Sequence, residues 1–191
     1  RVINNDGSYE IKVVAKDNSG NVSNESNTKT VYVDTVAPVI SDITGVTEGS
    51  HNTGVVTVIA SVKEKYYNED KYITTADVKK TLDGNVTEYQ MTATSANAEN
   101  ARAQFTFNED GTYEVTIKSV DAAGNMATEK KISFVVDNTL PIANITGVIE
   151  NNYYQDAVAA TIEVIESNYE TNDVRIEITK ELNGVTEQIQ S

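Results

Sequence analysis

The fold is decided by the stretch Asp110-Gly111-Thr112-Tyr113-Glu114-Val115-Thr116-Ile117-Lys118-Ser119-Val120. After the Asp-Gly turn signal, Tyr113, Val115 and Ile117 alternate with polar residues, which is the period of a β-strand with one buried face. A tyrosine near the start of such a strand can return its hydroxyl group to the backbone just upstream, forming a tyrosine corner. The stretch therefore predicts a strand that leaves a tight turn and contributes one face to a core.

The same pattern occurs earlier in the chain, as Asp6-Gly7-Ser8-Tyr9-Glu10-Ile11-Lys12. Each copy is followed by an Asp-Xaa-Xaa-Gly-Asn loop, at residues 17–21 and 121–125. Tyr9 is thus the second candidate for a tyrosine corner. The two copies begin at Asp6 and Asp110, so the period is close to the length of one small β-sandwich domain, about 100 residues.

A second repeated motif marks the domain boundaries. A Val-Asp pair is followed by a proline in Val33–Pro38 and in Val136–Pro141, and these two prolines are the only ones in the chain. Proline lacks an amide hydrogen and has a fixed φ, so it interrupts a β-ladder. We therefore expect a complete repeat over residues 37–137, the last strands of a preceding repeat over 1–36, and the first strands of a following repeat over 138–191.

Within the complete repeat, alternating β-formers and turn signals predict seven short strands and no helix. They are expected near residues 38–44, 54–63, 71–81, 86–93, 101–108, 112–120 and 129–136. This number of strands in about 100 residues predicts an all-β fold of tandem immunoglobulin-like Greek-key sandwiches. If residues 1–191 were a whole chain, we would expect the two partial repeats of neighbouring chains to complement each other head to tail.

Composition restricts the kinds of partner. The formal net charge is −14, from 29 acidic and 15 basic residues, which disfavours binding to nucleic acid or to an anionic membrane surface. No apolar stretch approaches the ~20 residues of a membrane span, so we expect no membrane insertion. Cysteine is absent, which excludes disulfides, thiolate metal sites and a cysteine nucleophile.

Together, the Asp-Xaa-Xaa-Gly-Asn loop and the Val-Asp-to-Pro junction resemble the bacterial immunoglobulin-like repeats of large surface adhesins, over essentially the whole chain. The resemblance implies a rod of stacked domains that holds a binding tip away from a bacterial cell, stiffened in some members by calcium between domains. It implies an extracellular segment of a surface-attached or secreted protein, whose partners are neighbouring repeats. The alternatives are a module that binds host glycan or protein, and an accessory region of a carbohydrate-active enzyme.

Calcium is the one cofactor for which the sequence offers candidate ligands, because hard cations need several oxygen donors and acidic residues recur at the loops and junctions. We pair Asp17 with Asp34, and Asp121 with Asp137, as candidate ligand sets. The alternative interpretation is structural: an aspartate that opens a five-residue loop can cap that loop with its own carboxylate.

One glutamate also recurs at an equivalent position, as Glu64 and Glu166. Each continues the inward-facing alternation of its strand, beside Val62 and Val164. An inward carboxylate needs partners. A metal site at the domain edge, bonds from loop amides, or a Lys–Asn isopeptide cross-link would each supply them.

Two further groups of residues have both a functional and a structural interpretation. Tyr66, Tyr67 and Tyr72 could form a stacking surface for a glycan or a protein, or could simply pack in the sandwich. His51, the only histidine, lies in a polar stretch without a nucleophile elbow nearby, so we expect an exposed loop residue. Because no catalytic set is recognisable, we expect that the chain is not an enzyme.

Overall fold

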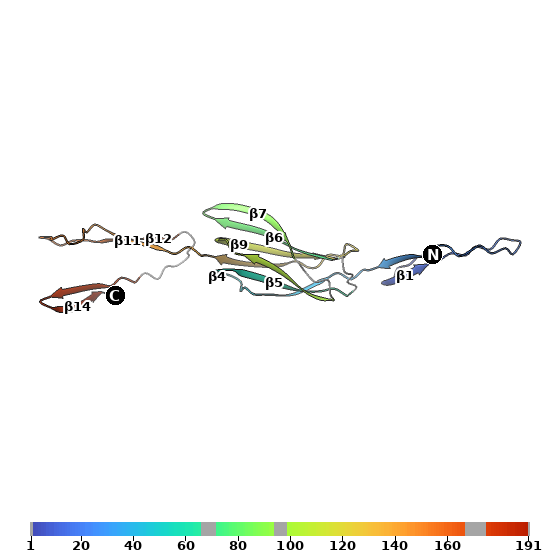
Figure 1. Cartoon of the computed structure of the whole chain (residues 1–191), viewed down its shortest axis with the longest axis horizontal. Coiled ribbons are helices and arrows are strands. Elements are labelled where there is room, and N and C mark those ends of the chain that lie inside the picture. Colours follow the sequence, from blue (N-terminus) through green and yellow to red (C-terminus); the bar gives the residue numbers. More distant parts are fainter. Residues whose placement is uncertain (1, 66–71, 94–98, 167–174, 191) are drawn as a thin grey trace. The chain divides into compact units, whose positions relative to one another are not determined.

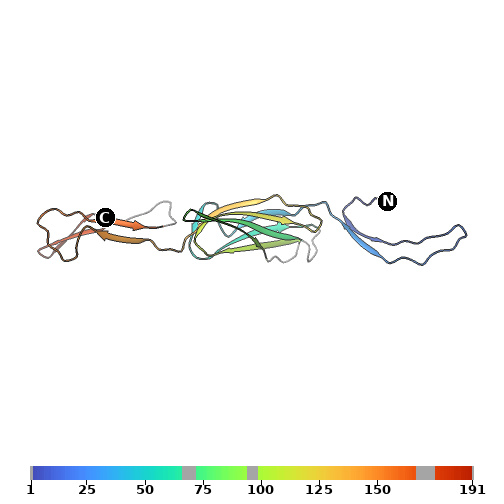
Figure 2. The same cartoon turned by 90° about the horizontal axis from the view of Figure 1, so that it is seen from above.

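The computed structural model describes residues 2–65, 72–93, 99–166 and 175–190. Its best-packed part consists of two β-sheets that face each other across one hydrophobic core (Figures 1 and 2). The smaller sheet contains, in order, β3 (Val39–Thr44), β5 (Val56–Lys63) and β8 (Asn100–Phe107). The larger sheet contains β4 (Ser50–Asn52), β10 (Lys130–Val136), β9 (Gly111–Val120), β6 (Ile73–Leu82) and β7 (Asn85–Thr92).

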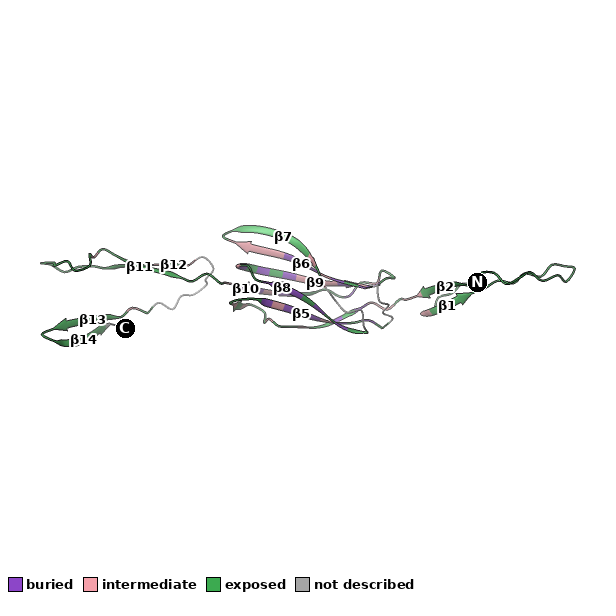
Figure 3. Ribbon diagram, viewed as in Figure 1, coloured by how far each residue is buried: buried purple, intermediate pink, exposed green. Residues whose placement is uncertain are grey.

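The core is built by strict alternation along the central strands. In β8 and β9 every second residue is buried, so one face of each strand lies in the core and the other faces outward (Figure 3). Val58, Phe105 and Val115 are each at most 1% exposed. The prediction of an all-β immunoglobulin-like sandwich is therefore confirmed for this part of the chain. No helix among the described residues is long and apolar enough to cross a membrane.

All strands predicted for this region are present, with ends that differ by a few residues, but β4 was not predicted. It consists of Ser50, His51 and Asn52 and pairs in parallel with the edge of β10. Its residues are polar and do not alternate, so nothing local indicates a strand. The pairing exists because β10 offers an open edge, and the Asn52 side chain reinforces it by donating to the backbone oxygen of Val135 at 3.0 Å. His51 is exposed, as expected, but lies on this strand.

The two predicted tyrosine corners are present. The hydroxyl group of Tyr113 donates to the backbone oxygen of Glu109 at 2.7 Å, and that of Tyr9 donates to Asn5 at 2.7 Å. The Tyr113 ring also packs against Phe107 and Phe134, with centroids 5.0 and 5.3 Å away. Burial raises the pKa of Tyr113 to about 12, and nearby acidic side chains add to the shift.

A β-bulge absorbs a length difference between the two junction copies. The segment from Pro38 to Gly45 is one residue longer than its counterpart from Pro141 to Gly147. The pairing of β3 with β5 shifts register between Ile40 and Ile43, whereas β11 (Ile142–Thr146) pairs with β12 (Thr161–Ile165) without a shift. Because a bulge accommodates one extra residue in one strand, β3 and β5 remain paired on both sides of it.

The remaining described segments are hairpins: β1 (Gly7–Ile11) with β2 (Lys29–Val33), β11 with β12, and β13 (Ile178–Leu182) with β14 (Val185–Gln190). The chain divides into two compact units, residues 1–138 and 139–191. Apolar side chains of the first hairpin are exposed although their repeat counterparts are buried: Val13 is 60% exposed, and its counterpart Ile117 is 0% exposed. The division into repeats at 36/37 and 137/138, and their tandem arrangement, stay predictions.

Candidate metal site at the domain junction

Three carboxylates converge at the end of the sandwich where the chain enters it. Asp34, Glu64 and Asp121 each offer an oxygen atom, and these oxygens all lie within 4.8 Å of one another. The three residues come from separate segments, directly after β2, β5 and β9. A junction residue is thus brought beside two residues of the sandwich.

Glu64 is the most deeply placed of the three. It follows β5, in which Val62 is buried and Lys63 is exposed, and it continues that alternation, as the sequence predicted. Its backbone N–H donates to the backbone oxygen of Glu99 at 2.9 Å, which holds the residue beside the start of β8. The side chain is only 1% exposed, so its carboxylate lies inside the end of the sandwich.

Asp121 is held by the loop that it opens. Its carboxylate accepts hydrogen bonds from the backbone N–H and from the side-chain amide of Asn125, both at 2.8 Å. Asp17 makes the same two bonds with Asn21, and there the side-chain bond is the main cause that lowers the pKa of Asp17. The loop-capping interpretation is therefore correct for both residues. At Asp121 the capping carboxylate also faces the other two acids.

Asp34 is tied to the same loop. The side-chain amide of Asn125 donates to the backbone oxygen of Asp34 at 3.1 Å, in addition to its bond with Asp121. The Asp34 carboxylate accepts a bond from Val36 N–H at 2.9 Å, which shapes the chain as it approaches β3. Asn125 therefore bridges the junction and the sandwich, a role that the sequence analysis did not recognise.

The predicted pairings of Asp121 with Asp137 and of Asp17 with Asp34 are not formed. β9 and β10 run antiparallel with Gly111 opposite Val136, so Asp137 lies near the start of β9 while Asp121 follows its end. In the first hairpin, Gly7 pairs with Val33, which places Asp34 at one end of the ladder and Asp17 beyond the other. The loop aspartate Asp121 instead lies beside Asp34, the junction aspartate that precedes its repeat. The antiparallel direction of β9 and β10 would have predicted this, because it places Asp121 and Asp137 at opposite ends of the sandwich.

The opposite end of the sandwich has a second polar junction that the sequence analysis also missed. Asn138 donates its backbone N–H and its side-chain amide to the Asp110 carboxylate, at 2.8 and 2.9 Å. Its side-chain oxygen accepts from Gly54 N–H at 2.6 Å. At the earlier junction, Thr35 bonds Asp6 through its N–H and hydroxyl, at 3.0 and 2.9 Å. At both junctions, the residue after the aspartate, Thr35 or Asn138, therefore bonds the chain that leaves the domain to the aspartate of the Asp-Gly turn.

The geometry of the three acids suits a hard cation. Calcium–oxygen distances are about 2.3–2.6 Å, so two ligands on opposite sides of one ion lie about 5 Å apart. The spacing within 4.8 Å allows all three oxygens to share one ion. Burying carboxylates beside one another is unfavourable unless a cation or protons offset the charge. We refer to Asp34, Glu64 and Asp121 as the junction triad.

The tyrosines predicted to form a binding surface do not do so where they can be placed. Tyr72 is 4% exposed and belongs to the core, so its assignment as a ligand-contact residue is wrong. It directly precedes β6, and the inward phase of that strand carries it into the sandwich. Tyr66 and Tyr67 lie outside the described residues.

The match to a known domain family agrees with this architecture. A family model described as a bacterial Ig-like domain matches residues 42–138. No curated relative matches the chain. Among solved structures, the chain is similar to the crystal structure of chicken CNTN1 FN1–FN3 domains, with 12% identity and a TM-score of 0.36 over 85% of this chain. The similarity spans 62% of that chain.

Proposed function

Because this chain belongs to the bacterial Ig-like domain family, we propose that it is a non-catalytic spacer made of tandem repeats in a bacterial surface adhesin. Domains of this family are typically modules of surface or extracellular proteins. The observation that carries the proposal is the pair of polar junctions at the two ends of the sandwich. A chain that served only as a loose linker would not need its junction residues fastened to the domains beside them.

Each fastening restricts a different part of the junction. Asn125 holds the backbone of Asp34 before the sandwich begins, and Asn138 is held by Asp110 after the sandwich ends. Hydrogen bonds of this kind contribute about 0.5–1.5 kcal/mol each, and bonds to charged groups about 1.5–3 kcal/mol. Several of them at one junction limit how far the chain can bend there. In repeat proteins each unit contacts mainly its neighbours, so such restrictions add along the array.

We propose further that calcium occupies the junction triad and stiffens the junction. The ion would join Asp34, from the junction, to Glu64 and Asp121, from the sandwich. Asp137 and Glu166 occupy the corresponding positions of the next repeat in the sequence, so the same site would recur along an array. Residues 34, 64 and 121 would hold the ion, and the ion would supply positive charge that offsets the three carboxylates.

The experiment is small-angle X-ray scattering on the 1–191 chain, with calcium and with EGTA. We expect a larger radius of gyration and a narrower distance distribution with calcium. Asp34→Asn should abolish the difference, whereas Asp17→Asn, at an exposed loop outside the triad, should preserve it. Identical profiles in the two buffers would refute calcium stiffening. A profile typical of a flexible chain in both buffers would refute the proposed spacer function.

Calcium binding is measured separately by isothermal titration calorimetry, because an ion can bind without changing the shape of the chain. Binding that survives Asp34→Asn and Glu64→Gln together would place the ion elsewhere.

The second candidate function, a binding module, is favoured by a groove on the side of the sandwich.

A further inference from the structure

The two sheets of the sandwich differ in width, and the wider one overhangs the narrower. β7 is the edge strand of the five-stranded larger sheet, whereas the smaller sheet has three strands. Tyr89 pairs with Val78, and directly opposite residues of an antiparallel pair point to the same face. Val78 is 2% exposed, but Tyr89 on the same inner face is 40% exposed. The inner face of β7 is therefore exposed at Tyr89, and we call this face the β7 shelf.

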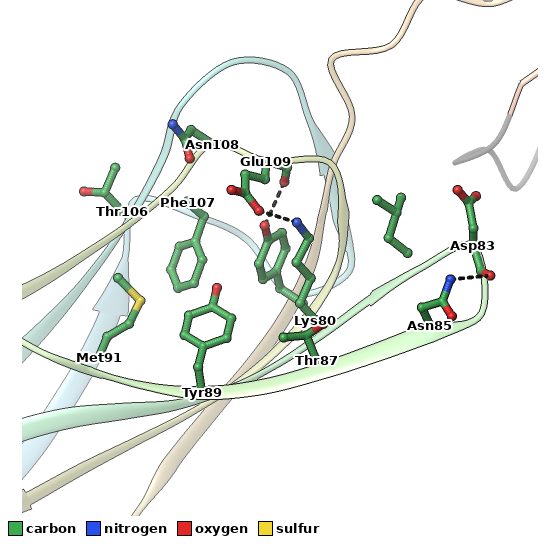
Figure 4. Close-up of a pocket in the computed structure, with 12 residues that line it drawn as sticks. Lys80, Asp83, Asn85, Thr87, Tyr89, Met91, Thr106, Phe107, Asn108 and Glu109 are labelled. Atoms are coloured by element: carbon green, nitrogen blue, oxygen red, sulfur yellow. Dashed lines mark hydrogen bonds and ion pairs between the residues drawn. The ribbon is translucent and has the colours of Figure 1, made fainter.

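Beneath this shelf lies a groove of about 480 Å³ between β7, β6 and the turn that joins β8 to β9. That volume is within the range of about 300–1,000 Å³ typical of small-molecule sites. Leu82, Met91, Phe107 and Tyr113 give the groove its apolar part. Figure 4 shows the ring of Tyr89 extending from β7 toward the ring of Phe107.

The charges in the groove largely cancel. The Lys80 ammonium group donates to the Glu109 carboxylate at 2.6 Å, and the Lys80 side chain is only 14% exposed. This ion pair lowers the pKa of Glu109 and so keeps it ionised. Asp83, at the hairpin turn, is the remaining charge of the lining. The net charge of −14 on the chain also disfavours the binding of an anionic ligand.

The other polar groups of the groove are neutral. Thr87 and Asn108 line it with a hydroxyl and an amide group. In the part of the chain that the structure describes, neither of these side chains forms a hydrogen bond with the protein. They can donate to and accept from a ligand that presents hydroxyl groups.

We propose that this groove binds a neutral sugar residue of a glycan. A pyranose ring has an apolar C–H face and a rim of hydroxyl groups. The exposed ring of Tyr89 fits the apolar face, and Thr87 and Asn108 fit the rim. The inference does not depend on the spacer function, since a spacer repeat can carry a lateral site, and it places the contact at Tyr89 rather than at Tyr72.

The test uses the whole 1–191 chain on an array of neutral, sialylated and sulfated oligosaccharides. Hits are then measured by NMR titration with methyl glycosides of glucose, galactose and mannose. We expect binding to a subset of the neutral glycans, with amide shifts confined to residues 85–91 and 106–109. Tyr89→Ala should weaken binding about tenfold, as expected for loss of a stacked ring, while Tyr89→Phe retains it. Tyr153→Ala, at a tyrosine that is 97% exposed in the other unit, should leave binding unchanged.

Several results would overturn the inference. These are retention of acidic glycans alone, retention of no glycan, shifts elsewhere in the chain, or equal binding by Tyr89→Ala and the wild-type chain. Capture of a peptide or protein without a neutral glycan would also overturn it. If Tyr89→Ala does not fold, as judged by circular dichroism, the shift map of the wild-type chain and the Thr87→Ala variant decide the question. Loss of the calcium effect on scattering would bear on the spacer proposal alone.

Discussion

Asn125 donates its side-chain amide both to the Asp121 carboxylate, at 2.8 Å, and to the backbone oxygen of Asp34, at 3.1 Å. One side chain thus closes the loop after β9 and also holds the junction that precedes the sandwich. The counterpart Asn21 closes its own loop by bonding Asp17 in the same way. The two asparagines therefore form a matched pair for separating loop capping from junction fastening.

We predict that Asn125→Ala loosens the junction, whereas Asn21→Ala does not. Both variants lose the side-chain bond to the loop aspartate, but only Asn125→Ala also frees the backbone oxygen of Asp34. We expect Asn125→Ala to lower the free energy of unfolding of the sandwich by about 1–3 kcal/mol, because one bond to a charged group and one bond to a backbone oxygen are lost. ¹⁵N relaxation should show faster motion of residues 33–38 in that variant alone. Equal relaxation in both variants would contradict a fastening role.

Glu64→Gln tests the junction triad through stability. With calcium about 100-fold above its dissociation constant, linkage adds about 2.7 kcal/mol to the wild-type chain. We expect the variant to lose most of that gain. In EGTA it should be at least as stable as the wild-type chain, because one of three neighbouring negative charges is removed. Thermal unfolding in the two buffers measures both effects.

Glu88→Gln, on the exposed β7 strand, is the control for that comparison and should behave like the wild-type chain. If Glu64→Gln were equally destabilising with calcium and with EGTA, Glu64 would act as a packing residue and not as a ligand.

Gly45→Ala tests the close approach at the start of the repeat. Gly45 has a φ of 89°, and a Cβ there would collide with the backbone oxygen of Thr57. Gly54 has a similar φ of 76°, but a Cβ added there would meet no other atom within 4 Å. Gly54→Ala should therefore lower the free energy of unfolding only by the backbone strain, about 1–2 kcal/mol. Gly45→Ala should lower it by clearly more, because the collision adds to the strain. Urea unfolding compares them, and equal costs would show that the collision is relieved by small shifts.

The predictable parts of this protein are those that local sequence determines. Alternation defines β5, β8 and β9, the Asp-Gly-Xaa-Tyr motif defines both tyrosine corners, and the phase of β5 gave the inward position of Glu64. The junction triad was not predictable in the same way, since its pairing depends on which end of the sandwich each loop occupies. Of the four aspartates that the sequence analysis proposed as ligands, Asp34 and Asp121 lie in the junction triad, and Asp17 and Asp137 do not.

Two other features depend entirely on contacts between distant segments. β4 exists because the edge of β10 is available, not because Ser50-His51-Asn52 favours a strand. The groove under β7 exists because one sheet is wider than the other, which no local pattern indicates. Tyr72 shows the converse error: its aromatic neighbours indicated a surface, but the inward phase of β6 places it in the core.

Tyr113→Phe, the last prediction, tests the tyrosine corner through pH. In the wild-type protein the pKa of Tyr113 is raised to about 12 from its ordinary value of 10.0. A group whose folded-state pKa is raised contributes stability that is present below its unfolded pKa and is lost as pH rises through the folded value. The wild-type sandwich should therefore lose stability between about pH 10 and 12 through this residue. Tyr113→Phe should lack that component, while losing about 0.5–1.5 kcal/mol at neutral pH with the hydrogen bond to Glu109.

Urea unfolding at pH 7, 10 and 11.5 measures both effects on the same protein. Tyr153→Phe, at an exposed tyrosine, should leave the pH dependence of the sandwich unchanged. If Tyr113→Phe followed the wild-type curve throughout the alkaline range, the corner hydroxyl would ionise without opposing the fold. The hydrogen bond to Glu109 would then be a consequence of packing and not a determinant of stability.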